Sequence, residues 1–202
     1  MVAKEVVDVL LQLSRALLAE NDGDQLTAAQ WIALRYFSRS NAYSRTLTGL
    51  AQYQATTAGT ASQTIKYLEQ AGYVERDIST RDARSSVFTI TEAGLAVMEE
   101  DPLAHLGQEI DDLSGADLLH LRDVLRYLLA NIGGEQPRRP FGTCKDCAFL
   151  LTRQARGPNA ARSNQYLCKL LNFYIADSEL NYLCKNFQAL REFQSPISRG
   201  TS

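Results

Sequence analysis

The chain has 202 residues, of which 45% are hydrophobic and 22% charged, with a formal net charge of −2. This composition is enough for one main domain and a smaller appendage, and it argues against a protein that binds every polyanion indiscriminately. No apolar run approaches the roughly 20 residues that span a bilayer, and the N-terminus lacks a signal segment, so we expect a cytoplasmic protein with no membrane partner.

The first predicted element is a helix over residues from about 3 to 20. Apolar residues recur there at helical spacing, and further apolar residues widen the stripe beyond what one packed face needs: Val6, Val7, Leu10, Leu13, Leu17 and Leu18, then Val9, Leu11 and Ala16. This width is typical of a helix that is buried against its own domain and also against another subunit. After a turn-rich break at residues 21–25, Thr27 and Gln30 form a capping box that begins the next helix.

The central stretch, residues 47–91, has the order of a winged helix-turn-helix: a short helix, a turn, a second helix and two β-rich runs. The apolar stripe of the second helix is Ala61, Ile65 and Leu68, and Gly72 ends it. Its remaining faces carry the residues that we predict to contact base edges and phosphates of duplex DNA: Thr60, Ser62, Gln63 and Lys66. Between the β-rich runs lies a polar tip whose Arg81 and Arg84 are predicted to approach phosphates or the minor groove. The plainer interpretation is a small α/β substructure with a solvated loop.

Two more helix starts follow the predicted wing. Thr91 caps one helix, Pro102 interrupts the helical region, and Ser114 with Asp117 caps a long helix that ends near Ile132.

The stretch from Val6 to Ile132 resembles the MarR family of dimeric winged-helix regulators. The resemblance is carried by LTAAQWIALRYF, by LAQYQATTAGTASQTIKYLEQAGYVER, and by the D-x-x-x-R-D-A-R run at 77–84 followed by FTITEAG. It implies a fold that is mainly α with a small β-wing (α+β), and a homodimer in which the first and last helices of this stretch intertwine. Such a dimer requires a pseudo-palindromic operator. We therefore expect a MarR-like domain over residues 1–134, with the winged helix at about 27–91 and dimerisation helices at about 3–20 and 92–132.

Residues 135–143 are predicted to be a linker, and residues 144–202 form a segment that the resemblance does not explain. Residues 135–202 hold ten Lys and Arg against five Asp and Glu. They also hold every cysteine of the chain, Cys144, Cys147, Cys168 and Cys184, in the pattern C-x2-C-x20-C-x15-C. A reducing cytoplasm disfavours disulfides, and a segment this short seldom folds without a cross-link or a bound metal. We therefore predict a metal-stabilised lobe with the four thiolates as ligands. Buried free thiols are the alternative.

The spacing favours an iron–sulfur cluster, 2Fe–2S or 4Fe–4S, because zinc ribbons generally present two C-x2-C pairs whereas Cys168 and Cys184 stand alone. Zinc remains the alternative. We thus predict a DNA-binding transcriptional regulator whose operator affinity depends on the cluster. The alternative is a MarR-type regulator that responds to a small organic ligand and carries a structural zinc. An enzyme is disfavoured, because no His or acid accompanies the cysteines in a catalytic pattern.

Overall fold

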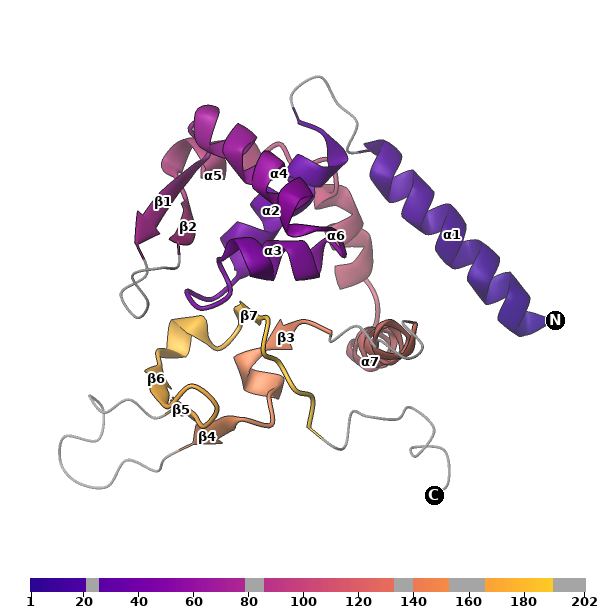
Figure 1. Ribbon diagram of the computed structural model, residues 1–202. Helices are drawn as coiled ribbons and strands as arrows, with labels where there is room; N and C mark the ends of the chain where they lie inside the picture. Colours follow the sequence, from indigo (N-terminus) through magenta and orange to yellow (C-terminus); the bar gives the residue numbers. More distant parts are fainter. Residues whose placement is uncertain (21–25, 79–85, 133–139, 153–165, 191–202) are drawn as a thin grey trace. The chain divides into compact units, whose positions relative to one another are not determined.

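The computed structural model describes residues 1–20, 26–78, 86–132, 140–152 and 166–190, which are drawn as coloured ribbon in Figure 1. The chain divides into two compact units. Unit 1 comprises Met1–Ser38 and Arg45–Leu113, and unit 2 comprises Arg39–Ser44 and Ser114–Ser202. Within the described ranges, no helix is long and apolar enough to cross a membrane.

Unit 1 has the order of elements that the sequence predicts for a winged helix. Its elements are α1 (Val2–Glu20), α2 (Ala28–Arg39, with Arg39 in unit 2), α3 (Leu47–Tyr53), α4 (Ala58–Gln70), β1 (Val74–Ile78), β2 (Ser86–Ile90), α5 (Glu92–Met98) and α6 (Ala104–Asp111). The two strands pair antiparallel, with Val74 opposite Ile90 and Ile78 opposite Ser86. They form the narrow ribbon beside α5 in Figure 1.

The core of unit 1 is built around α2, because this helix buries large side chains on more than one face. Tyr36 and Phe37 are fully buried, and Phe37 contacts the ring of Phe88 in β2, with ring centroids 5.6 Å apart. The helices α3 and α4 close the core with Leu50, Ala51, Ala61, Ile65 and Leu68. The apolar stripe predicted for the second helix of the motif is therefore confirmed.

The predicted helix starts and stops are also confirmed. Gln30 and Thr27 exchange the two hydrogen bonds of a capping box, Thr91 accepts from the amide of Gly94, and Ser114 accepts from Asp117. Gly72 adopts a φ of +74° just after α4, which only glycine does without strain. These features are found correctly from sequence because each depends on residues within one helical turn.

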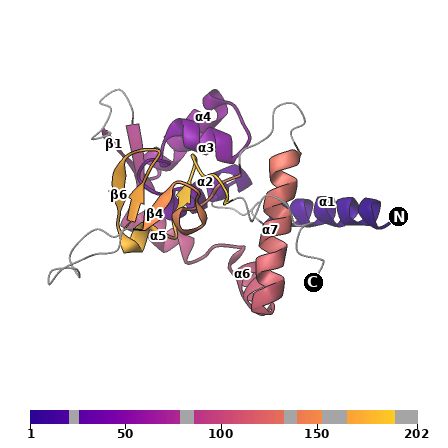
Figure 2. The ribbon, with the colours of Figure 1, turned by 90° about the horizontal axis from the view of Figure 1, so that it is seen from below.

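Unit 2 contains a long helix and a set of short strands. Its elements are α7 (Gly115–Asn131), β3 (Gly142–Thr143), the 3-10 turn η1 (Cys144–Asp146), β4 (Leu150–Thr152), β5 (Tyr166–Cys168), β6 (Phe173–Ile175), η3 (Asp177–Glu179) and β7 (Leu183–Cys184). The strands form two small antiparallel sheets, β3–β7 and β4–β5–β6. Figure 2 shows α7 along its full length.

The two compact units and the predicted domains group two segments of the chain differently. The helix α7 belongs to the same unit as the cysteines, although the sequence places it with the dimerisation helices before residue 134. Residues 39–44, which lie between α2 and α3 in the chain, are also part of unit 2. The predicted linker at 135–143 falls mostly outside the described residues, and its last two residues form β3.

Candidate functional site

The helix α4 presents a polar surface to solvent, because its apolar residues are buried in the core of unit 1. Thr57 caps the helix and accepts a hydrogen bond from the amide of Thr60. The four residues predicted to contact DNA from this helix, Thr60, Ser62, Gln63 and Lys66, are all exposed. The hydroxyl of Thr60 lies 3.0 Å from that of Thr57, so it takes part in the cap as well.

Two of these residues line a shallow groove of about 430 Å³ within unit 1. Gln63 and Lys66 contribute to it together with Thr27 and Gln30 from the start of α2. Thr60 and Ser62 do not line it. The predicted set of contact residues is thus exposed along α4, but only part of it faces this groove.

The β-wing is held to α4 by an ion pair. Arg76 in β1 donates from Nε and Nη2 to the carboxylate of Glu69, each at 2.9 Å, and its guanidinium also lies over the ring of Phe88 at 5.3 Å. The hydrogen bonds to Glu69 raise the pKa of Arg76. This bidentate contact fixes the base of the wing relative to α4. The predicted tip residues Arg81 and Arg84 lie outside the described residues.

All four cysteines line one pocket in unit 2, with a volume of about 20 Å³. Its remaining walls are apolar apart from one amide side chain: Phe149, Leu150, Leu170, Leu171, Ile175 and Asn186. Cys144, Cys147 and Cys184 are buried, and Cys168 is half-buried. Cysteines that lie up to 40 positions apart in the sequence are therefore brought to one small, mainly apolar pocket.

Short strands gather the cysteines. Cys144 begins the turn η1, and the amide of Cys147 closes that turn by donating to the carbonyl of Cys144 at 3.1 Å. Cys184 is the last residue of β7 and pairs with Gly142 at the start of β3. Cys168 ends β5, opposite Leu150 in β4. Each of the two isolated cysteines is thus placed beside the C-x2-C turn by a strand pairing.

Gly142 allows this arrangement to close. A Cβ atom at this position would lie 2.6 Å from three carbon atoms of the Phe187 ring. Phe187 is itself 4% exposed and packs with Cys147 and Cys184. Only a residue without a side chain lets β3 approach the ring this closely.

The surroundings of Cys144 disfavour its thiolate. Burial, and to a smaller extent the neighbouring cysteines, raise the pKa of Cys144 to about 12, against a hydrogen bond from Asn41 that lowers it. In the described part of the chain, no three His, Cys, Asp or Glu side chains are gathered closely enough to hold a metal ion. The four thiols share a pocket, but to bind a metal they would have to point toward one centre. The positive charge of the metal would then offset the cost of forming thiolates in this pocket.

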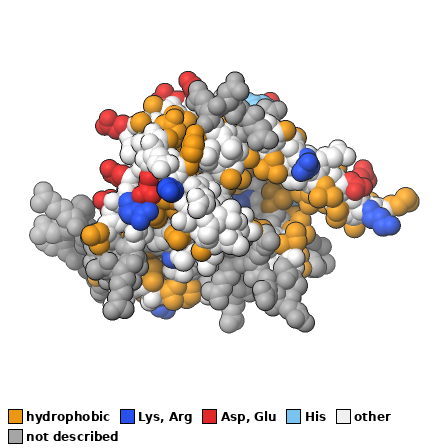
Figure 3. All heavy atoms as spheres, turned by 45° about the horizontal axis from the view of Figure 1, so that its top comes forward, with side chains coloured by type: hydrophobic (Ala, Val, Ile, Leu, Met, Phe, Trp, Pro, Cys, Tyr) orange, Lys and Arg blue, Asp and Glu red, His pale blue; other side chains and the backbone are white. Residues whose placement is uncertain are grey.

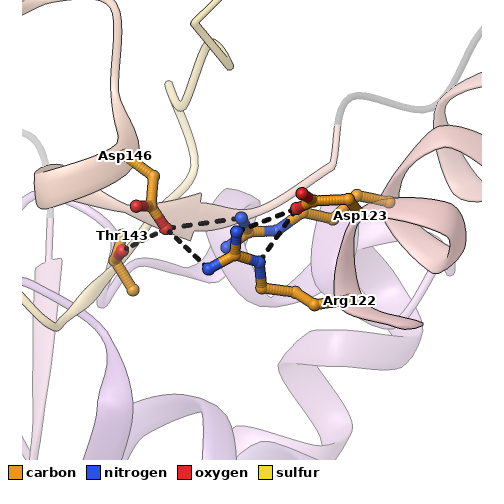
Figure 4. Close-up of polar contacts among 5 residues, drawn as sticks. Arg122, Asp123, Thr143 and Asp146 are labelled. Atoms are coloured by element: carbon orange, nitrogen blue, oxygen red, sulfur yellow. Dashed lines mark hydrogen bonds and ion pairs between the residues drawn. The ribbon is translucent and has the colours of Figure 1, made fainter. Parts of the chain in front are cut away.

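The C-x2-C turn is attached to α7 through Asp146, the residue just before Cys147 (Figure 4). Its carboxylate lies 3.3 Å from Nη1 of Arg126 and 3.7 Å from Nη1 of Arg122, and it accepts a hydrogen bond from Thr143 at 3.3 Å. Arg122 also pairs with Asp123 on the same helix at 2.9 Å. We call these four charged residues and Thr143 the Asp146 cluster. Sequence reasoning missed it, because nothing local distinguishes Asp146 from other acids.

A second contact to the pocket comes from residues that precede α3. Asn41 donates from Nδ2 to the sulfur of Cys144 at 3.9 Å, near the outer limit for a sulfur acceptor. The Lys185 amide donates to Ser44 Oγ at 2.9 Å. Asn41 and Ser44 were also missed, since they are at least 100 residues from the cysteines and lie in no recognisable motif.

Comparisons with known proteins agree on the fold of the first part of the chain. Residues 24–85 match the model of the MarR family. No curated protein matches the chain significantly. Among solved structures, S. aureus MepR in a DNA-binding conformation is 16% identical with a TM-score of 0.55, and the match covers 65% of this chain and 98% of MepR. CouR from Rhodococcus jostii RHA1, bound to p-coumaroyl-CoA, is 16% identical with a TM-score of 0.54, covering 63% of this chain and 94% of CouR. The predicted winged-helix fold is confirmed, and about a third of the chain lies outside these matches.

Proposed function

We propose that the protein is a DNA-binding transcriptional regulator that reads duplex DNA with α4 and the β-wing. The observation that carries this proposal is the exposed polar face of α4 inside a segment that matches the MarR family model. The similarity in fold to MepR in its DNA-binding conformation supports it. Thr60, Ser62, Gln63 and Lys66 are the proposed major-groove contacts, with Arg81 and Arg84 at the tip of the wing.

The regulator acts as a homodimer in this proposal. The helix α1 leaves large apolar side chains exposed in the single chain, including Val7 at 54%, Val9 at 56% and Leu11 at 59%. Hydrophobic side chains, in orange, are visible on the α1 arm at the right of Figure 3. A contiguous apolar surface of this kind indicates a protein interface. Two-fold symmetry of the dimer would then require a pseudo-palindromic operator.

DNA contact by α4 is tested by two variants with different expected signatures. The operator is first selected from a random-sequence duplex library with the full-length protein. Lys66→Gln is expected to weaken binding to every duplex alike and to lower the slope of log affinity against log salt by about one, because one phosphate contact is lost. Gln63→Ala is expected to relax the preference at one base pair and to leave the salt slope unchanged. Unaltered affinity and specificity in both variants would exclude α4 as the reading helix.

The four cysteines are proposed to hold an iron–sulfur cluster whose presence sets operator affinity, which would make the protein a sensor of redox state, oxygen or iron. The supporting observation is that Cys144, Cys147, Cys168 and Cys184 line one apolar pocket. Four thiolates match the ligand count of a 2Fe–2S or 4Fe–4S cluster. The cluster supplies a charge that is present in one state and absent in the other. The chain's own residues hold it, wall it from water and respond to that charge.

Metal analysis of the isolated protein tests this part first. Protein purified without oxygen is expected to be brown, with iron and acid-labile sulfide in the same sample. Cys168→Ser is expected to abolish loading. If operator affinity is the same for loaded wild-type protein, for metal-free protein and for Cys168→Ser, the cluster does not control DNA binding.

A structural zinc with a small organic effector is the second candidate. CouR, which is similar in fold, was solved with p-coumaroyl-CoA bound. Unit 2 contains a pocket of about 470 Å³ between α7 and the strands, lined by Tyr127, Ala130, Phe149 and Phe187 among others. Colourless protein with one zinc per chain, and operator binding that responds to a small organic ligand and not to oxidants, would favour this function over the first.

A further inference from the structure

The loop between α2 and α3, residues 40–46, contains an unusual concentration of buried polar side chains. In the described part of the chain the buried polar residues are Ser40, Asn41, Ser44 and Thr64, and three of these four lie in this α2–α3 loop. Burial of a polar group is unfavourable unless it is hydrogen-bonded. The Ser40 hydroxyl has no hydrogen-bond partner among the described residues, so the partners of Asn41 and Ser44 indicate what stabilises this loop.

Several contacts of this loop are made with residues that flank the cysteine pocket in the chain. The Asn41 amide donates to the carbonyl of Leu183 at 2.9 Å, one residue before the predicted ligand Cys184. The amide of Lys185, one residue after it, donates to Ser44 Oγ at 2.9 Å. The ring of Tyr43 packs on that of Phe173, with centroids 3.9 Å apart. The loop is thus fastened to both sides of Cys184.

The side chain of Asn41 is held in one orientation. Its Oδ1 accepts from both the amide and the hydroxyl of Ser44, at 3.0 and 2.8 Å. Since the oxygen is used in this way, Nδ2 is turned to the other side, where it donates to the sulfur of Cys144. Asn41 is 4% exposed, so water does not compete for this contact.

The other end of the α2–α3 loop belongs to the helix-turn-helix. Directly after Ser44, the carbonyl of Arg45 accepts a hydrogen bond from Phe88 in β2 at 2.8 Å. The next residue, Thr46, caps α3 by accepting from the amide of Gly49. Only two residues, Arg45 and Thr46, therefore separate Ser44, which is bonded to the residue after Cys184, from the first helix of the DNA-binding motif.

We infer that the α2–α3 loop is the output element of the cysteine pocket, and that Asn41 is the positioning residue that reads whether Cys144 is a metal ligand. The inference rests on the proposed function. A ligating sulfur has lost its proton to solvent and is an anionic acceptor, whereas a thiol is a weak one. Loading therefore strengthens the Asn41 contact and stabilises the loop conformation described above. Loss of the metal weakens that contact. The loop is then held less firmly at Arg45 and Thr46, where α3 begins.

The test uses the full-length protein and its selected duplex, and it compares operator affinity in the loaded and metal-free states. Loading is done with ferrous iron and sulfide without oxygen, or with zinc alone if the isolated protein holds zinc. The ratio of the two affinities measures the coupling, which for allosteric proteins is typically about 5- to 150-fold. Asn41→Asp keeps the acceptor for Ser44 and replaces the donor to Cys144. Ser44→Ala keeps that donor, removes the tether to Lys185 and leaves the backbone amide of residue 44 to hold Asn41 Oδ1.

Both variants are expected to bring the coupling ratio to within about twofold of one, because each breaks a different step of the same path. Asn41→Asp alone is expected to shift the sulfur-to-metal charge-transfer absorption, which a merely structural role would not move. Asp123→Asn, which breaks an ion pair that stays within α7, is expected to keep the wild-type ratio. A wild-type ratio in both loop variants, or its loss in Asp123→Asn alone, would overturn the inference.

Metal content separates the remaining outcomes. If Asn41→Asp takes up no metal, Ser44→Ala decides alone, and a wild-type ratio there overturns the inference. If the wild-type protein takes up no metal, or binds DNA equally with and without it, the proposed sensing function fails, and the role of the loop is refuted with it.

Discussion

Replacement of Asp146 by asparagine is expected to weaken the attachment of the C-x2-C turn to α7. The change removes one charge at nearly constant volume and leaves Arg122 and Arg126 without their shared carboxylate. Asp146, Arg126 and Arg122 are 18%, 20% and 29% exposed, so the ion pairs are better shielded from water than typical surface pairs. A surface pair contributes up to about 1 kcal/mol, and we expect the two pairs together to contribute about 1–2 kcal/mol.

Hydrogen exchange of the α7 amides measures this contribution locally. A loss of about 1–2 kcal/mol corresponds to an opening equilibrium about 5- to 30-fold larger, and so to protection factors lower by the same factor. The fluorescence of Trp31, the chain's one tryptophan, reports on unit 1 separately, since this side chain is 4% exposed in the unit 1 core. Unfolding followed by that signal is expected to be unchanged in Asp146→Asn.

Asp123→Asn is the matched control. Asp123 also pairs with Arg122, at 2.9 Å, but both residues belong to α7 and the pair does not reach the C-x2-C turn. Only Asp146→Asn should expose the turn and the end of α7 to exchange together. Equal loss of protection in the two variants, or none in Asp146→Asn, would refute the reasoning that Asp146 joins the turn to the helix.

Three other substitutions have defined outcomes. Burial alone would raise the pKa of Asp101, but hydrogen bonds and the charge of Arg35 bring it below its usual value. The ionised Asp101 therefore stabilises the fold above the unfolded pKa of about 3.9, and this stabilisation is lost as pH falls through the lower folded value. Asp101→Asn should remove that acid dependence, and should cost about 1–2 kcal/mol at neutral pH in denaturant unfolding. Gly142→Ala should cost about 1–3 kcal/mol, because the new Cβ forces the ring of Phe187 to move, and metal uptake should fall with it. Leu11→Glu should shift the protein toward monomer in sedimentation experiments, and unchanged mass there would exclude α1 from the interface.

The parts of the fold that follow from the sequence are those set within a few residues. The capping pair Thr27 and Gln30 and the stop at Gly72 depend on one helical turn of chain, and they were predicted correctly. The exposed face of α4 was predicted as the complement of its apolar stripe. The side chain of Thr60 was assigned wholly to DNA, although it also joins the cap at Thr57, three residues earlier.

The contacts that depend on chain topology were not predictable in this way. Asn41 lies 103 residues before Cys144, in a segment whose composition suggests only a turn. Its side chain meets the sulfur of Cys144 only in the folded chain, where β7 also places Leu183 beside the Asn41 amide and Lys185 beside Ser44. Likewise, the apolar spacing of α7 predicts a helix but carries no information on whether Arg126 pairs with an acid of its own helix or with Asp146.

The α2–α3 loop also affects how the chain reaches its native state during synthesis. Ser44 leaves the ribosome 141 residues before Lys185, its hydrogen-bond donor. At about 5–20 residues per second, this interval lasts on the order of ten seconds or more. For most of that time α2, α3 and α4 have been synthesised, while Asn41 and Ser44 lack the partners that bury them. The α2–α3 loop of a nascent chain is therefore hydrated first, and its hydrogen bonds to the cysteine segment form only after β7 has been made.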